Sequence, residues 1–233
     1  MGKEKDEDLR HGHRKRMKEQ FMASVRDDEF PDYQLLEMLL FYALPRVDTR
    51  ETAKKLINKF GSFANVFSAD AEELKSIKGV TENLMVFLKL ILVASRRYHV
   101  SVMEGQKFKT VKDYGEFLLE QYDGVKTEMM SMISLTSTHK FISFDVISTG
   151  ETDSVTVSAR KIVEKVLKNK AHSIIIAHNH PSGIAIPSVS DAEATVTIKR
   201  LLSQVGVHLI DHVVLENDDY VSMAQSAEYT HIF

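Results

Sequence analysis

The sequence contains no cysteine, which excludes disulfide bonds and thiolate metal ligands. It also lacks an apolar run of the ~18 residues that a membrane-spanning helix needs, because Lys89 interrupts the best candidate at 84–94. The N-terminus is charged and has no apolar core of a secretory signal. Any metal site must therefore use histidine and carboxylate side chains, and we expect a cytoplasmic protein without membrane contact.

The sequence also has little excess of positive or negative charge. A net charge of −3 on 233 residues excludes polyanion binding by bulk charge alone. Residues 1–108 carry 19 basic and 17 acidic side chains, whereas the remainder carries 11 and 16. With 43% hydrophobic and 27% charged residues, the composition is typical of a globular protein, and the length allows one or two domains of roughly 100–200 residues.

The two halves differ in their apolar periodicity. The first half shows helical spacing, with Pro31 and Gly61 as a start and a stop signal, and predicts helices near 31–44, 49–60, 70–77 and 82–98. The second half alternates strand-like runs at 129–135, 141–147, 172–177, 207–215 and 220–223 with helices at 111–122, 158–170 and 188–205. We therefore expect an α/β (α+β) protein with a helical domain at 1–100, a linker at 101–109 and a second domain at 110–233.

The most informative segment is AHNHPSGIAIPSVSD, residues 177–191. His178 and His180 stand at the end of an apolar run, and residues two apart in a strand project to the same face. Asp191 follows in the first turn of the next expected helix. Two imidazoles and one carboxylate make a three-ligand metal site that leaves a fourth position for water.

Asp191 also has a structural interpretation, because Ser188-x-x-Asp191 is the pattern of a capping box at a helix N-terminus. The two roles are compatible, since the first turn of a helix helps to fix the carboxylate. His212 has two interpretations too: it either supports a metal ligand or is a core imidazole, and we expect the core imidazole.

The spacing His-x-His-x7-Ser-x2-Asp, formed by His178, His180, Ser188 and Asp191, resembles that of the JAMM (MPN+) metalloproteases. The variant HNHPSG is similar to the RadC branch of that family in particular. The resemblance includes Glu128 ahead of MMSMISL, and it extends over the chain through HGHRKR, IKGV, LIDHVVL and the terminal YVS.

This resemblance implies a C-terminal JAMM/MPN+ domain with a cytidine-deaminase-like sheet flanked by helices and a bound Zn²⁺. His178, His180 and Asp191 would be the metal ligands, Glu128 the general base toward a metal-activated water, and Ser188 the donor to a developing oxyanion. The implied enzyme is a zinc metallopeptidase that cleaves a peptide, isopeptide or related amide bond in a peptide or protein substrate.

Alternatives remain open at this stage. Without the resemblance, Glu128 has no advantage over Glu120 or Glu151 as a base. The JAMM domain of a RadC-like protein could also be a non-catalytic scaffold, or part of a DNA-associated repair or recombination accessory protein. The helix–hairpin–helix-like turn at 78–81 has Thr81 in place of a second glycine, which restricts close approach to phosphate. We therefore expect the N-terminal half to be a packing or protein-recognition module.

Overall fold

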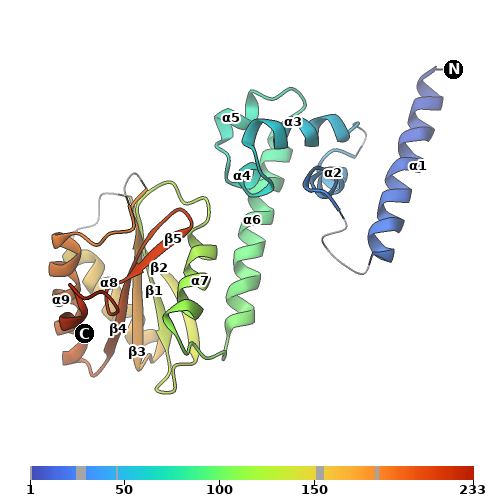
Figure 1. Cartoon of the computed structure of the whole chain (residues 1–233). Coiled ribbons are helices and arrows are strands. Elements are labelled where there is room, and N and C mark those ends of the chain that lie inside the picture. Colours follow the sequence, from blue (N-terminus) through green and yellow to red (C-terminus); the bar gives the residue numbers. More distant parts are fainter. Residues whose placement is uncertain (1, 25–29, 46, 151–154, 182–183) are drawn as a thin grey trace. The chain divides into compact units, whose positions relative to one another are not determined.

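The computed structural model of the chain describes residues 2–24, 30–45, 47–150, 155–181 and 184–233 (Figure 1). The chain forms two compact units, Met1–Ala94 and Ser95–Phe233. The first is helical, and the second contains a mixed β-sheet flanked by helices, which confirms the predicted fold class. No helix in the described ranges has the length and apolarity needed to cross a membrane.

The N-terminal unit is built from helices whose ends follow the signals in the sequence. Pro31 precedes the second helix, Gly61 ends the third with a φ of 82°, and the Ser62 hydroxyl accepts a hydrogen bond from the Asn65 amide at the start of the fourth. The elements are α1 (Gly2–Ala23), α2 (Asp32–Ala43), α3 (Arg50–Phe60), α4 (Phe63–Ser68), α5 (Ala71–Lys75) and the start of α6 (Glu82–Met103). Their core includes Leu36, Leu40, Leu56, Val66, Leu84 and Leu88.

Part of the basic run in α1 is used inside this unit. The Arg14 guanidinium donates to the carbonyl oxygens of Leu44 and Pro45 at 2.8 and 2.7 Å, just beyond the end of α2. His13 Nε2 lies 2.9 Å from Oε1 of Glu37, which is buried. Cationic side chains are favourable at a helix C-terminus, so these contacts fix α1 against α2.

The C-terminal unit contains a five-stranded sheet in the order β2-β1-β3-β4-β5. Strands β1 (Met129–Leu135) and β2 (Phe141–Thr149) form an antiparallel pair, and β3 (Ser173–Asn179) is antiparallel to β1. Strand β4 (His208–Glu216) is parallel to β3 and antiparallel to β5 (Asp219–Ser222). All five strand ranges predicted from periodicity agree with these bounds to within two residues.

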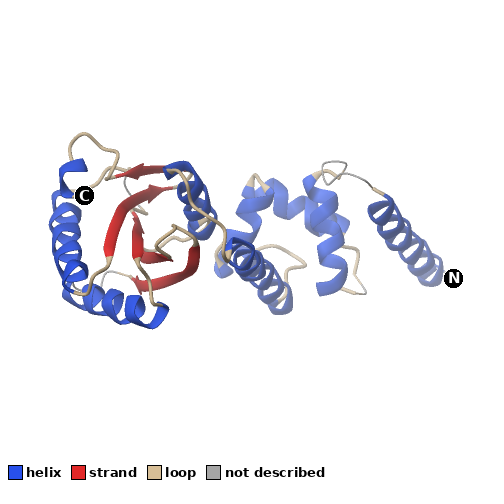
Figure 2. Ribbon diagram, turned by 90° about the horizontal axis from the view of Figure 1, so that it is seen from below, coloured by secondary structure: helices blue, strands red, loops and turns tan. Residues whose placement is uncertain are grey.

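Helices cover both faces of this sheet (Figure 2). Helix α7 (Val111–Tyr122) packs on the face that receives Ile175 and Ala177, whereas α8 (Val155–Asn169) and α9 (Val189–Gln204) pack on the face that receives Ile174 and Ile176. All seven residues of β3 are buried. A strand that is covered on both sides reads as a continuous apolar run, which is why SIIIA lacks alternation.

The segment predicted as a linker, 101–109, belongs structurally to the C-terminal unit. Helix α6 continues to Met103, five residues beyond its expected end. Lys107 then pairs with Lys140 in an isolated bridge, and the Phe108 ring is buried against Phe117 and Phe141. The segment was predicted as a linker because its residues are mostly polar, and nothing in that composition indicates that Phe108 is buried.

A polar cluster holds α8 to the edge strand β2 and to its neighbour β1. Lys165 Nζ donates to Asp145 at 2.6 Å, and Asn169 Nδ2 donates to Asp145 and to the hydroxyls of Ser134 and Ser143. Burial acts to raise the pKa of Asp145, but the hydrogen bonds from Lys165, Ser143 and Asn169 outweigh it and lower the pKa below 3.8. The fold therefore favours the ionised carboxylate.

Helix α7 approaches the last strand closely at Gly115. A Cβ atom at this position would lie 2.3 Å from the nearest ring atom of Tyr220 on β5. A glycine inside a helix costs about 1 kcal/mol relative to alanine, and here that cost permits the aromatic ring to pack directly on the helix backbone.

Candidate metal centre

Two imidazoles meet where β3 leaves the sheet. His178 is the penultimate residue of β3 and is 2% exposed, and His180 follows directly after the strand and is half-buried. The amide of His180 donates to the carbonyl of Leu215 at 2.9 Å, which extends the pairing with β4 by one residue. As the i, i+2 spacing predicts, the side chains project together, and their Nε2 atoms lie 2.9 Å apart.

Asp191 reaches the same place from the start of α9. It forms the predicted capping box with Ser188: the Ser188 amide and hydroxyl donate to Oδ2 at 2.7 and 2.6 Å, and the Asp191 amide donates to the Ser188 hydroxyl at 3.2 Å. Asp191 Oδ1 lies 3.3 Å from His178 Nε2, and Oδ2 lies 3.5 Å from His180 Nε2. Capping and approach to the histidines therefore occur in one conformation.

Electrostatics keep the Asp191 carboxylate ionised. Partial burial acts to raise its pKa, but the interaction with the adjacent His178 imidazole and the hydrogen bonds from Ser188 outweigh burial and hold the pKa well below its usual value. Its position in the first turn of α9 adds the favourable interaction of an anion with a helix N-terminus.

The donor atoms fit a divalent metal ion. One ligand atom from each of His178, His180 and Asp191 lies within 4.8 Å of the other two. In a tetrahedral zinc site with bonds of about 2.0–2.2 Å, neighbouring donor atoms are about 3.3–3.6 Å apart. The Nε2 atoms of His178 and His180 are 2.9 Å apart, and the Asp191 carboxylate approaches them at 3.3 Å through Oδ1 and at 3.5 Å through Oδ2. Imidazole nitrogen and carboxylate oxygen are also donors that zinc accepts.

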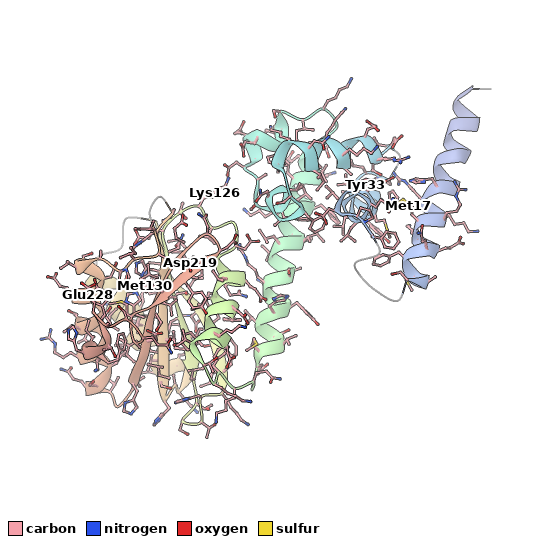
Figure 3. All side chains as sticks on the ribbon, viewed as in Figure 1. Met17, Tyr33, Lys126, Met130, Asp219 and Glu228 are labelled. Atoms are coloured by element: carbon pink, nitrogen blue, oxygen red, sulfur yellow. The ribbon has the colours of Figure 1, made fainter. Side chains whose placement is uncertain are left out.

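Glu128 lies beside this group. It directly precedes β1, is exposed, and lines a cavity of about 150 Å³ together with His178 and Asp191. Met130, labelled in Figure 3, and Ser190 line the same cavity. The register Met130↔His178 explains this placement, because the antiparallel pairing brings the start of β1 to the end of β3.

The structure describes one of the other two acidic residues considered as bases. Glu120 lies on α7, where its carboxylate contacts the His99 imidazole. Glu151 lies outside the described residues.

The Asn179 side chain, at the end of β3, holds the segment 125–129 that contains Glu128. Its side-chain Oδ1 accepts from the Met129 amide at 2.8 Å, and its Nδ2 donates to the carbonyls of Thr127 and Val125 at 3.2 and 3.4 Å. The residue is 6% exposed. Sequence reasoning missed this role, and the only signal was an asparagine between the two histidines.

His212 extends the group into the core. It is 1% exposed, as expected for a core imidazole, yet its Nε2 also lies 2.8 Å from Nδ1 of His178. Its Nδ1 lies 2.6 Å from the hydroxyl of Thr195, a residue of α9 that sequence reasoning missed. Burial lowers the pKa of His212 well below 6.5, and the nearby His178 reinforces the effect. The ring is therefore neutral at pH 7.

A bulge in β4 decides which way His212 faces. The register jumps from Ile174↔Leu209 to Ile175↔Asp211, so Ile210 is an extra residue. Since a shift of one residue turns every following side chain to the other face, the bulge brings His212 to the side of His178. Asp211 then faces α7, where it accepts hydrogen bonds from the hydroxyls of Tyr114 and Ser222 at 2.7 and 2.5 Å.

These features define a class of protein: a mixed α/β domain with a His-His-Asp group at a strand end that could hold a metal ion. The sequence profile of the RadC-like JAB domain matches residues 108–229. The chain is 36% identical over 222 residues to UPF0758 protein FN0909 of Fusobacterium nucleatum subsp. nucleatum, covering 92% of this chain and 95% of the relative. It is 32% identical over 204 residues to UPF0758 protein SPO0054 of Ruegeria pomeroyi, covering 87% and 91%. The chain belongs to the RadC-like JAB domain family.

Proposed function

We propose that the C-terminal unit is a zinc-dependent metallohydrolase of the JAMM type that cleaves a peptide, isopeptide or related amide bond in a peptide or protein substrate. The convergence of His178, His180 and Asp191 on one point beside Glu128 carries this proposal. A zinc ion held by these three side chains supplies a Lewis acid that polarises an amide carbonyl and makes water more acidic.

Glu128 is the proposed proton acceptor. It lines the cavity that His178 and Asp191 also line, so its carboxylate can receive a proton from water in the cavity and return it to the leaving amine. A positioned general base of this kind contributes about 10²–10⁴ in rate. The attachment through Asn179 and Met129 keeps the backbone at Glu128 in place during this transfer.

Ser188 has a defined task before any substrate binds. Its hydroxyl donates to Oδ2 of Asp191, so it orients the carboxylate. A hydroxyl has one proton to donate. Donation to an oxyanion during hydrolysis, the role that the family resemblance implies for Ser188, requires exchange of this hydrogen bond.

The proposal is tested by zinc content and hydrolysis together. We expect wild-type protein to bind about one equivalent of zinc and to cleave members of a mixture of internally quenched peptides and lysine-isopeptide conjugates. The double variant His178→Ala/Asp191→Ala should lose zinc and activity. Glu128→Gln should keep zinc and lose about 10²–10⁴ in rate.

The matched control is Glu120→Gln, which removes a carboxylate that does not line the cavity. It should leave zinc content and rate unchanged. Wild-type protein that takes up no zinc on reconstitution would refute the metal centre. Zinc uptake equal in wild type and the double variant would refute the proposed ligands, and equal loss of rate in both glutamine variants would remove Glu128 from its proposed role.

A further inference from the structure

A chain of hydrogen bonds runs from the backbone of α9 to the proposed metal site. The Thr195 hydroxyl donates to the Asp191 carbonyl at 2.5 Å, four residues earlier in the helix. Two other acceptors lie within its reach: Met223 Sδ at 3.8 Å, a weak thioether acceptor, and His212 Nδ1 at 2.6 Å. Donation to either would leave two acceptor oxygens facing each other at 2.5 Å, so the proton points to the Asp191 carbonyl. Since the hydroxyl has one proton, its oxygen is left to accept from His212 Nδ1 at 2.6 Å.

The direction of this first hydrogen bond determines the next one. A neutral imidazole carries one N–H donor and one acceptor nitrogen. With the proton of His212 on Nδ1, its Nε2 is an acceptor, and it lies 2.8 Å from His178 Nδ1. His178 must then hold its own proton on Nδ1, which leaves the Nε2 lone pair facing Asp191 and His180.

His180 reaches the same state by a different contact. Its Nδ1 lies 3.2 Å from the carbonyl oxygen of Ile184, which can only accept, so the proton resides on Nδ1. The Nε2 atoms of both histidines therefore present lone pairs to each other and to the carboxylate of Asp191. Three acceptors at these distances are stabilised by a cation between them.

We propose that His212 and Thr195 are positioning residues that fix His178 in the Nδ1–H tautomer and so prepare its Nε2 to bind the metal. This inference rests on the proposed function for the identity of the site. Hydrogen-bond partners of ligating histidines affect metal affinity by about 10- to 100-fold.

The variant that tests it best is Thr195→Val, which keeps the shape of the fully buried side chain and removes its hydroxyl. We expect zinc affinity, measured by competition with a chromogenic chelator, to fall by about 10- to 100-fold. Thr195→Ser restores the hydroxyl and should restore affinity. The control is Thr197→Val, because the Thr197 hydroxyl donates to the backbone carbonyl of Glu193 on the same helix, at an exposed position.

A second measurement needs neither zinc nor a variant. Long-range ¹H–¹⁵N correlation spectra of the metal-free wild-type protein report the tautomer of each histidine. We expect Nδ1–H for both His178 and His212. An Nε2–H signal from His178 would overturn the inference, as would zinc affinity of Thr195→Val equal to that of Thr197→Val. Failure of the wild type to bind zinc would instead refute the proposed function, and the tautomer spectra would still decide the inference.

Discussion

Asp191→Asn separates the two tasks of one carboxylate. Oδ2 accepts both hydrogen bonds from Ser188, and Oδ1 faces His178. An asparagine can keep its oxygen toward Ser188 and place its amide group toward the imidazoles. The cap is then retained, whereas the negative metal ligand is lost. Ser188→Ala does the reverse, because it removes the cap hydroxyl and leaves the carboxylate.

The two variants should differ in their free energy of unfolding and in how much zinc stabilises them. Loss of an N-cap hydroxyl costs about 0.5–2 kcal/mol in the free energy of unfolding, so metal-free Ser188→Ala should be destabilised by that amount. Zinc at 100 times its dissociation constant should stabilise the wild type by about 2.7 kcal/mol. If Asp191→Asn weakens zinc binding by 100-fold or more, the same zinc concentration stabilises it by at most about 0.4 kcal/mol.

Urea unfolding with and without zinc, with chelator in the metal-free series, measures these differences. We expect Asp191→Asn to remain within about 1 kcal/mol of the metal-free wild type and to lose nearly all stabilisation by zinc. Full stabilisation of Asp191→Asn by zinc would refute ligation. A metal-free loss larger than that of Ser188→Ala would refute the division of the carboxylate into two tasks.

Three further predictions concern the framework of the site. Asn179→Leu leaves the buried Met129 amide without its acceptor and should lower the free energy of unfolding by about 1–3 kcal/mol in urea. Asp145→Asn should destabilise the protein by on the order of 1 kcal/mol at pH 7. The pKa of Asp145 in the folded protein lies below 3.8, so the stability that its carboxylate contributes is complete above that value and is lost as the pH falls through the folded pKa. The difference in the free energy of unfolding between wild type and variant should therefore shrink toward pH 3. Gly115→Ala places a Cβ 2.3 Å from the Tyr220 ring and should lower the Tm through about 1–3 kcal/mol of overpacking.

Each of these has an outcome that contradicts it. Wild-type stability of Asn179→Leu would show that the hydrogen bond to Met129 contributes nothing net. A constant difference between wild type and Asp145→Asn from pH 7 to pH 3 would contradict the lowered pKa. A raised Tm for Gly115→Ala would mean that helix propensity outweighs the contact with Tyr220.

Local geometry explains how much of the site the sequence could predict. The joint projection of His178 and His180 follows from the strand period, and the place of Asp191 follows from the capping pattern with Ser188. The contact between His178 and His212 depends on a bulge at Ile210, and no local pattern marks which residue of LIDHVVL is the extra one. Without the bulge, Asp211 would face the histidines.

The fold was predictable to a similar depth. The halves differ in period, so the helical region and the sheet were expected in the observed places. The sequence did not predict that 101–109 packs in the C-terminal unit. The packing of Phe108 on Phe117 and Phe141 depends on tertiary contacts that the polar neighbours of Phe108 do not indicate. The role of Asn179 was hidden for the same reason, since its partners lie 50 or more residues earlier.

Helix α9 contributes two residues to the site, and they lie one turn apart. Asp191 contributes a carboxylate directly, and Thr195 acts on the opposite side of the same imidazole through His212. A rigid displacement of this helix would therefore change the geometry and the protonation pattern of the centre at once. A partner that binds the outer surface of α9 and shifts the helix would therefore alter the site without touching any of its residues.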